Sequence, residues 1–317
     1  TIVHHKRRTC ITYAIGRNWL NTYKPFKKKR MVFAISNILT RCRVEMIFFS
    51  TKEKTEDLIY QAMSFMEKRQ PKNAIPLFKK ILKNDPKNII ALHNLGLALN
   101  QLKKYQDAIT CFEKVTNIDP KYIAAINNRG IALAELGNTD DASKYYDKAI
   151  EIDPKYAAAH YNKGVLYDKL LQHEEAIQSL DMALKCDSGN VNTAFYKGIV
   201  LGKMKKHQEA LNCFENISRK HPKHLDAFFH KGIELAELEK HDKALEIFDK
   251  ILQLYGDNVN VIYAMARSHA AMSNVDRALY LLEQAVKKDR KTIKKWAAED
   301  EFFDSLFDEP KFRKLVK

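Results

Sequence analysis

A spacing of 34 residues recurs along most of this chain. Glycine occurs at this interval at five positions, and Ala62 and Ala266 occupy the same phase before and after them: Gly96, Gly130, Gly164, Gly198 and Gly232. Twelve residues after each of these seven positions comes alanine: Ala74, Ala108, Ala142, Ala176, Ala210, Ala244 and Ala278. Sixteen residues after each comes a large apolar residue: Phe78, Phe112, Tyr146, Leu180, Phe214, Phe248 and Leu282. A period of this length indicates a stack of similar units rather than one globular core.

Each unit has the pattern of two amphipathic helices. In one of them, Ile126, Gly130 and Leu133 are spaced to lie on one stripe of a first helix, and Ala142 and Tyr146 on one stripe of a second. Proline disfavours helical geometry in the residue before it and lacks the amide that would continue a helix. The second helices are therefore expected to end at three Asp-Pro pairs: 85–86, 119–120 and 153–154. The chain has only 10 Gly and 8 Pro, which favours a mostly helical protein.

These columns resemble the signature of the tetratricopeptide repeat family over about four fifths of the chain. The resemblance implies an all-α fold, a right-handed α-solenoid of helix-turn-helix repeats. We expect seven repeats within residues 51–292, at about 55–88, 89–122, 123–156, 157–190, 191–224, 225–258 and 259–292. Residues 293–317 are expected to form a C-terminal capping helical segment, whose apolar side covers the end of the stack with Phe303, Leu306, Phe312 and Leu315.

Residues 1–50 hold most of the chain's positive charge. They contain 11 Lys or Arg and one acid, Glu45, a net of +10 out of the total of +15, which leaves +5 for residues 51–317. One interpretation is a tether to nucleic acid or a membrane surface, or a targeting leader. The other is that this extension is disordered or not part of the native protein, with translation starting at Met31 or Met46. Any nucleic-acid or membrane contact is expected only through these residues.

The most apolar stretch, from Met31 to Ser50, contains Arg41, Arg43 and Glu45. The uncharged run before Thr40 is shorter than the ~20 residues that a membrane-spanning helix needs. No transmembrane helix is expected.

The resemblance implies that the first helices of successive repeats line a concave surface. The repeated position that holds Gly or Ala in each unit is called the Gly phase below. Three residues before it lie four aromatic side chains: Tyr161, Phe195, Phe229 and Tyr263. One residue after it lie five aliphatic side chains: Leu97, Ile131, Val165, Ile199 and Ile233. One interpretation is a groove that receives apolar side chains of a partner peptide or helix. The other is that these residues fill the space between neighbouring first helices.

A column of asparagines, Asn94, Asn128 and Asn162, lies two residues before the Gly phase and then changes to Tyr196 and His230. An amide side chain both donates and accepts hydrogen bonds, so such a column can hold an extended peptide backbone. In related repeat regions of protein O-linked sugar transferases an asparagine ladder has this role. Asparagine is also frequent in this column across the family, which favours a structural role. We expect a groove with a polar N-terminal half and an apolar C-terminal half.

The carboxylate clamp of chaperone adaptors is another use of the family. Its basic residues are missing here, because the corresponding positions are His93, Leu97, Asn127, Asn128 and Ala158. We therefore expect no chaperone C-terminus as partner. Four bases directly before the Gly phase predict a solvated rim of salt bridges: Arg129, Lys163, Lys197 and Lys231.

Signs of catalysis are missing from the sequence. No phosphate-binding loop, zinc-protease motif, nucleophile elbow or dinucleotide fingerprint is present. His173, His207 and His241 recur at the repeat spacing, which places them in different layers of the stack. Each is expected to replace an aromatic residue rather than to bind metal. We expect no cofactor, no metal and no small-molecule substrate.

The five cysteines form no C-x-x-C pair and are odd in number, so a disulfide framework is not expected and a reducing compartment, the cytoplasm, fits best. The sequence therefore predicts a monomeric, non-enzymatic adaptor that binds another protein. The alternatives are a structural module that self-associates through its stack ends, or a basic-tailed tether.

Overall fold

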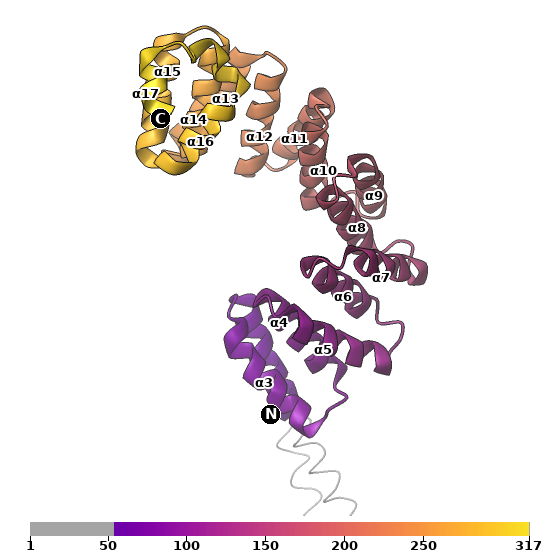
Figure 1. Cartoon of the computed structure of the whole chain (residues 1–317). Helices are drawn as coiled ribbons and strands as arrows, with labels where there is room; N and C mark the ends of the chain where they lie inside the picture. Colours follow the sequence, from indigo (N-terminus) through magenta and orange to yellow (C-terminus); the bar gives the residue numbers. More distant parts are fainter. Residues whose placement is uncertain (1–53, 317) are drawn as a thin grey trace, which may run out of the picture. The chain divides into compact units, whose positions relative to one another are not determined.

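The computed structural model describes residues 54–316, which are helices joined by short turns without any strand (Figure 1). The expected all-α fold of consecutive helix-turn-helix pairs is confirmed. The described residues fall into two compact units, one ending at Leu102 and the other beginning at Lys103. The basic extension, with both interpretations of it, and the apolar stretch from Met31 to Ser50 lie outside the described residues.

The first unit contains a helix over 54–67, α3 (Pro71–Asn84) and α4 (Ile89–Gln101). Proline is tolerated in the first turn of α3 because an amide there has no partner within the helix. Ala62, Ala74 and Phe78 are fully buried in this unit, and α3 packs against α4. The repeat columns in this unit thus form a core.

The second unit continues the same alternation of short helices (Figure 1). Its helices are α5 (Tyr105–Ile118), α6 (Ile123–Glu135), α7 (Thr139–Ile152), α8 (Ala157–Lys169), α9 (His173–Cys186), α10 (Val191–Lys203), α11 (His207–Lys220), α12 (Leu225–Glu237), α13 (His241–Tyr255), α14 (Val259–Ala271), α15 (Val275–Lys288), α16 (Arg290–Glu299), the 3-10 helix η1 (Glu301–Leu306) and α17 (Pro310–Val316). Each helix from α6 to α15 packs against the helices before and after it, as a stack of pairs requires.

Aspartate follows directly after four second helices in this unit. Asp119, Asp153, Asp187 and Asp289 come after α5, α7, α9 and α15. The Asp119 and Asp153 carboxylates accept hydrogen bonds from backbone amides two residues on, at 3.0 and 2.9 Å. These bonds and the proline that follows each of the two residues stop the helix where the sequence predicts.

Close contact between the two helices of a pair depends on the glycine phase. A Cβ atom on Gly130 would lie 2.6 Å from Tyr146 Cε1, and one on Gly232 would lie 2.5 Å from Phe248 Cε1. Because Tyr146 and Phe248 are almost completely buried, they cannot move aside. The small residue in the first helix therefore makes room for the large residue in the second.

The turn inside each pair has a left-handed residue that also repeats every 34 positions. Gly137 has φ 84°, and six other residues in the same phase have φ between 55° and 61°: Arg69, Lys103, Leu171, Lys205, Glu239 and Ser273. Six of the seven turns thus use a conformation that costs a side chain about 1 kcal/mol or more. This turn is not evident in the sequence, because glycine occupies the position only once.

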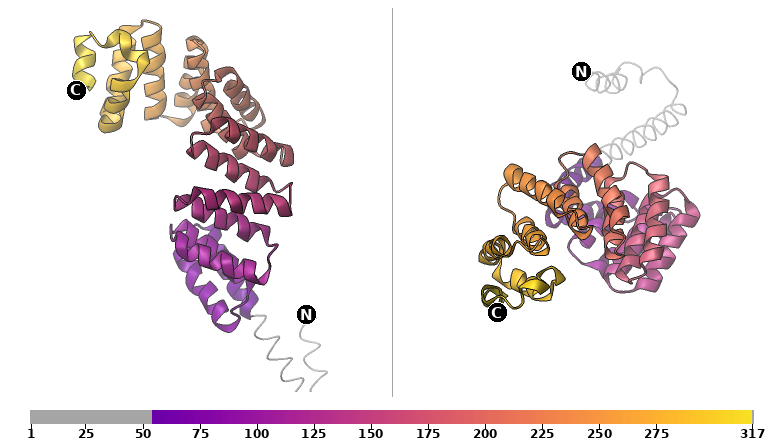
Figure 2. Two further views of the ribbon diagram at one scale, coloured as in Figure 1. Left: turned by 45° about the vertical axis from the view of Figure 1, so that its right-hand side comes forward. Right: turned by 90° about the horizontal axis from the view of Figure 1, so that it is seen from above.

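The C-terminal segment packs on the last helix pair, and its helices (yellow) lie side by side in both views of Figure 2. Phe303, Leu306 and Phe312 are fully buried in one cluster with residues of α14 and α15, and Leu315 is partly buried against it. These four side chains therefore lie against the last helix pair.

The packing at the glycine phase can be tested with Gly232→Ala. Overpacking in a rigid core costs about 1–3 kcal/mol, and alanine recovers up to about 1 kcal/mol of helix propensity. We expect a net loss of about 1–2 kcal/mol in the free energy of unfolding, measured by urea denaturation. Gly189→Ala is the control, because the nearest atom to its added Cβ is 3.7 Å away. Equal effects of the two substitutions would contradict the role of the contact.

The left-handed turns can be tested by a reciprocal pair of substitutions. A Cβ on Gly137 would contact nothing within 4 Å, so Gly137→Ala reports backbone strain alone and should cost about 1 kcal/mol. Leu171 is 78% exposed, and Leu171→Gly should stabilise the protein by about 0.5 kcal/mol, since relief of strain exceeds the added chain entropy. Thermal unfolding measures both. A lower melting temperature for Leu171→Gly would show that the left-handed conformation is not strained at this position.

Candidate functional site

Three of the four predicted groove aromatics are half-buried on first helices. Tyr161 lies on α8, Phe195 on α10 and Phe229 on α12. The Phe195 ring centroid is 5.5 Å from that of the core residue Phe214, and Phe229 is 6.0 Å from Phe248. These side chains therefore pack on the core with one part and face solvent with another.

Tyr263 departs from the groove expectation. It is only 7% exposed, and its hydroxyl donates a hydrogen bond of 2.7 Å to the Asp300 carboxylate. Its ring lies 5.6 Å from that of Trp296 and 5.8 Å from that of Phe303. The capping segment covers the place that a further repeat would leave open, so Tyr263 serves packing at this end.

The aliphatic column is half-buried throughout. Ile131, Val165, Ile199 and Ile233 lie on α6, α8, α10 and α12, and Leu97 lies on α4 of the first unit. Ile131, Ile199 and Ile233 pack against clusters of buried core residues. Their exposed parts form apolar surface beside the aromatic residues.

Two of the predicted asparagines use their amide donors within the protein. Asn94 Nδ2 donates to the backbone oxygen of Ile90 at 2.8 Å, and Asn162 Nδ2 donates to Asn127 Oδ1 at 2.9 Å. Asn127 itself is 3% exposed. Asn128 is half-buried on α6. The contacts of Asn94 and Asn162 favour the structural role for these two members of the column.

A hollow of about 480 Å³ lies between the first turns of α8 and α10. It brings together Tyr161 and Phe195 of the predicted aromatic column with Tyr196, which replaces asparagine in the adjacent column. The rings of Tyr161 and Tyr196 meet edge to face at 5.9 Å. The remaining lining residues come from α8, α10 and the connection between α9 and α10: Ala157, Ala158, Asp187, Asn190, Asn192 and Thr193.

The polar wall of this hollow is partly satisfied by its own residues. Asn190 Oδ1 accepts from the Thr193 amide at 3.0 Å, and Asp187 accepts from Asn190 Nδ2 at 3.1 Å. Within residues 54–316, the side-chain amide of Asn192 and the Tyr161 hydroxyl have no hydrogen-bond partner. These two groups are available to a ligand backbone. Asn192 was not predicted from the sequence, although it stands where alanine occurs in the two preceding units.

A buried carboxylate joins α8 to α10 beside this hollow. The Asp168 side chain is 3% exposed and accepts hydrogen bonds of 2.7 Å from both the Tyr196 hydroxyl and Lys203 Nζ. His173 Nδ1 lies 3.0 Å from its other oxygen. Burial raises the pKa of Asp168, but the bonds from Lys203 and Tyr196 and the charge of Lys203 outweigh it, so the pKa lies below its usual value. Asp168 thereby fixes the position of Tyr196 in the hollow.

A second buried acid joins α11 to α12. Glu234 is 5% exposed and lies 2.8 Å from His207 Nδ1. Burial raises the pKa of Glu234, and His207 opposes this effect. A Cβ on Gly202 would lie 2.7 Å from Glu234 Oε1, so glycine in α10 makes room for the carboxylate.

Both acids could have been found from the sequence. Glu234 stands in a column that elsewhere holds Ala, Leu, Val or Ser, and Asp168 in one that elsewhere holds Met, Asn, Ala or Gly. An acid in a small or apolar column needs a partner, since an unpaired buried charge is costly. His173 and His207 thus pair with acids, whereas the ring of His241 lies 6.1 Å from that of Phe302.

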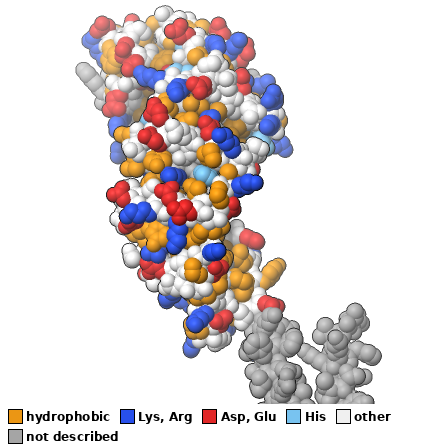
Figure 3. Space-filling model, turned by 90° about the vertical axis from the view of Figure 1, so that its right-hand side faces the viewer, with side chains coloured by type: hydrophobic (Ala, Val, Ile, Leu, Met, Phe, Trp, Pro, Cys, Tyr) orange, Lys and Arg blue, Asp and Glu red, His pale blue; other side chains and the backbone are white. Residues whose placement is uncertain are grey.

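The rim of ion pairs is present as the sequence predicts. Lys163 pairs with Asp147 and Lys197 with Asp181, each at 2.6 Å, and each pair joins a first helix to the preceding second helix. Arg129 pairs with Glu113 and Lys231 with Glu215 in the same way. Figure 3 shows one face of the molecule, on which acidic and basic side chains are interspersed.

Two further observations concern metal ligands and membrane-spanning helices. In the described part of the chain, no group of three or more His, Cys, Asp or Glu residues is placed to hold a metal ion. No helix between residues 54 and 316 has the length and apolar character to span a membrane.

Comparison with models of protein families found four that match, all described as tetratricopeptide repeat. They cover residues 58–88, 89–122, 127–191, 197–259 and 235–298. Comparison with the curated proteins found no match.

Solved structures with a similar fold include a tetratricopeptide repeat protein from Parabacteroides merdae. It is 19% identical, with a TM-score of 0.55, over 83% of this chain and 97% of that one. PilW, a type IV pilus biogenesis factor, is 22% identical with a TM-score of 0.59, over 65% of this chain and 96% of that one. A chain of the APC/C hetero-tetramer Cut9-Hcn1 is 16% identical with a TM-score of 0.58, over 80% of this chain and 47% of that one.

The role of Asp168 can be tested by Asp168→Asn. At neutral pH we expect a loss of about 1–3 kcal/mol in the free energy of unfolding, because a charged hydrogen-bond acceptor is removed. The pKa of Asp168 is lowered by folding, so its stabilisation is present above the ordinary value of 3.8 and is lost as pH falls through the folded-state pKa.

Urea denaturation of both proteins at a series of pH values measures this effect. The difference between them should be constant near neutrality and should shrink below about pH 4. Asp147→Asn is the control, because that carboxylate is 47% exposed and should contribute little. A difference that does not change with pH would contradict the role of the Asp168 charge.

Proposed function

Because the chain belongs to the tetratricopeptide repeat family, we propose that it is a non-enzymatic scaffold that binds a segment of a partner protein on its first helices. The fold is in general a protein–protein interaction scaffold, and its members are typically not enzymes. The observation that carries the proposal is the hollow between α8 and α10.

The hollow has the chemistry of a pocket for one large apolar side chain. Tyr161, Phe195 and Tyr196 supply aromatic walls, and buried aromatic contacts usually contribute most of the affinity in such interfaces. The Asn192 amide and the Tyr161 hydroxyl stand beside them and can bond to the backbone of the same ligand.

An extended occupant would reach beyond the hollow. Val165 lies four residues after Tyr161, and Ile199 four residues after Phe195, so each lies on the same helix face one turn further on. Both are half-buried, and their exposed parts would continue the apolar contact. This continuity favours a peptide or helix of a partner over a small molecule, and it agrees with an apolar C-terminal half of the groove.

The proposal also covers the oligomeric state of the chain and the compartment in which it acts. The similar chain of Cut9-Hcn1 belongs to a hetero-tetramer, and PilW is a pilus biogenesis factor. We propose that this chain likewise works with other proteins, and that it is itself a monomer that holds its partner in the cytoplasm. The free thiols of Cys111, Cys186 and Cys213 are what a reducing compartment would maintain.

The test uses a variant that blocks the hollow without removing core contacts. Ala158 is exposed in the first turn of α8 and lines the hollow, so Ala158→Arg places a long side chain there in a helix that tolerates arginine. Peptides selected from a displayed random library on the full chain serve as probes. We expect their affinity for Ala158→Arg to fall about tenfold or more, measured by fluorescence anisotropy.

Gln178→Arg is the matched control, because Gln178 is exposed on α9 and does not line the hollow. Circular dichroism should give the same helical content for both variants and the wild type. Selected peptides that bind Ala158→Arg as well as Gln178→Arg would exclude the hollow as the binding site.

A further inference from the structure

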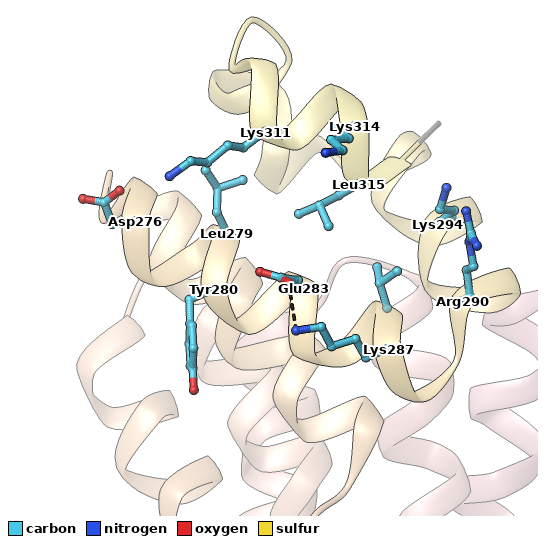
Figure 4. Close-up of a pocket in the computed structure, with 11 residues that line it drawn as sticks. Asp276, Leu279, Tyr280, Glu283, Lys287, Arg290, Lys294, Lys311, Lys314 and Leu315 are labelled. Carbon is cyan, nitrogen blue, oxygen red and sulfur yellow. Dashed lines mark ion pairs between the residues drawn. The ribbon is translucent and has the colours of Figure 1, made fainter.

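A larger hollow, of about 740 Å³, lies between the last helix pair and the capping helices. Its apolar part comes from Leu279, Val286 and Leu315, with Tyr280 at the edge. Figure 4 shows Leu279 of α15 and Leu315 of α17 pointing into the space from facing walls. Tyr280 is 52% exposed, which is unusual for a large aromatic side chain. This part of the surface can therefore accept apolar groups.

Positive charge surrounds this apolar part. Five cations line the hollow and only two carboxylates do: Lys287, Arg290, Lys294, Lys311 and Lys314 against Asp276 and Glu283. They come from α15, α16 and α17, so three separate elements supply the charge (Figure 4). Charges of one sign around an apolar surface raise the electrostatic potential in the space between them.

Most of these cations form no ion pair with a described residue, although the charge of Lys311 helps to lower the pKa of Glu283. Lys287 pairs with Glu283 at 2.8 Å. Within residues 54–316, no carboxylate pairs with the other four: Arg290, Lys294, Lys311 and Lys314. Lys288 and Arg313 lie on the same helices but outside the hollow, and they pair with Asp257 and Asp308. Four cations without an ion pair thus line the hollow, and Lys291 and Lys295 of α16 are cations outside it that likewise form no ion pair with a described residue.

We propose that this hollow binds an acidic amphipathic segment of a partner protein, separate from the site between α8 and α10. Carboxylates of the segment would pair with the four cations that form no ion pair, and one or two Leu or Phe side chains would cover Leu279 and Leu315. Complementary charge sets the orientation and the rate of association, and the apolar contacts supply affinity.

Other occupants fit the charges less well. Residues 1–50 of the same chain carry a net charge of +10 and would be repelled. The acidic stretch 299–309 of a second copy is held in its own cap, where Phe303 and Leu306 are fully buried. A lipid or nucleic-acid surface is uniformly negative and would meet Asp276 and Glu283 on the wall, whereas amide or basic groups of a peptide can bond to them.

The experiment uses a fluorescein-labelled synthetic peptide of Glu, Asp, Leu and Phe with the full chain. One comparison peptide replaces the acids by Lys, and another replaces Leu and Phe by Ser. Fluorescence anisotropy should give binding of the first peptide only. The double variant Lys311→Glu with Lys314→Glu should weaken it about tenfold or more. Both lysines are exposed and unpaired, so the variant should fold, which circular dichroism checks.

Lys148→Glu with Lys250→Glu is the matched control, since both residues are exposed on α7 and α13 away from the hollow and the change in charge is equal. It should retain binding, and Lys311→Gln with Lys314→Gln should have an intermediate effect. Ala158→Arg should also retain binding, which separates this proposal from the proposed function.

Three outcomes would overturn the proposal: no binding of the acidic peptide, equal binding of the Lys peptide, or equal losses in the test and control variants. Retention on vesicles containing phosphatidylserine without peptide binding would assign the hollow to a lipid surface instead.

Discussion

Four helix pairs of the second unit are closed by one kind of contact, in which a large side chain of the second helix lies against the backbone of the first. At Gly130, Gly164, Gly198 and Gly232 the distance from an added Cβ to the facing side chain would be 2.9 Å or less. This contact sets how closely the helices of each pair approach. The stack and the proposed site between α8 and α10 depend on it, because side chains from neighbouring units meet only when the helices are held at that separation.

The units share the same apolar packing but differ in their polar contacts. The rim of ion pairs repeats from unit to unit and is partly exposed, so each pair contributes little energy. The buried acids are different, because Asp168 and Glu234 each occur once and bind partners on a neighbouring helix pair. A unit shifted along the stack would leave these carboxylates buried without partners. The two acids thus distinguish the α8–α10 and α11–α12 junctions from the other junctions between units. Asp168 also holds Tyr196 at the proposed peptide site.

The two proposed sites differ in chemistry and are built from different helices. The hollow between α8 and α10 has aromatic walls and neutral polar groups, whereas the hollow among α15, α16 and α17 has an apolar floor and unpaired cations. A scaffold with both would hold two dissimilar segments at once. The second would respond more strongly to salt, because exposed charge pairs are screened at physiological ionic strength.

The spacing of 34 residues by itself determined the all-α fold, the helix pairs and the rim of ion pairs, since small and large residues in these columns can pack in only a few ways. It also indicated Tyr161 and Phe195, two of the residues in the first hollow. Tertiary structure alone decided that Tyr263 is covered, that Asn162 bonds to Asn127, and that unpaired cations gather around Leu315. The first two outcomes arise from side chains about one repeat apart in sequence, and the third from three helices at the C-terminal end, so each depends on how one element packs on another. A column pattern describes what each unit has in common, but a site forms where neighbouring units differ.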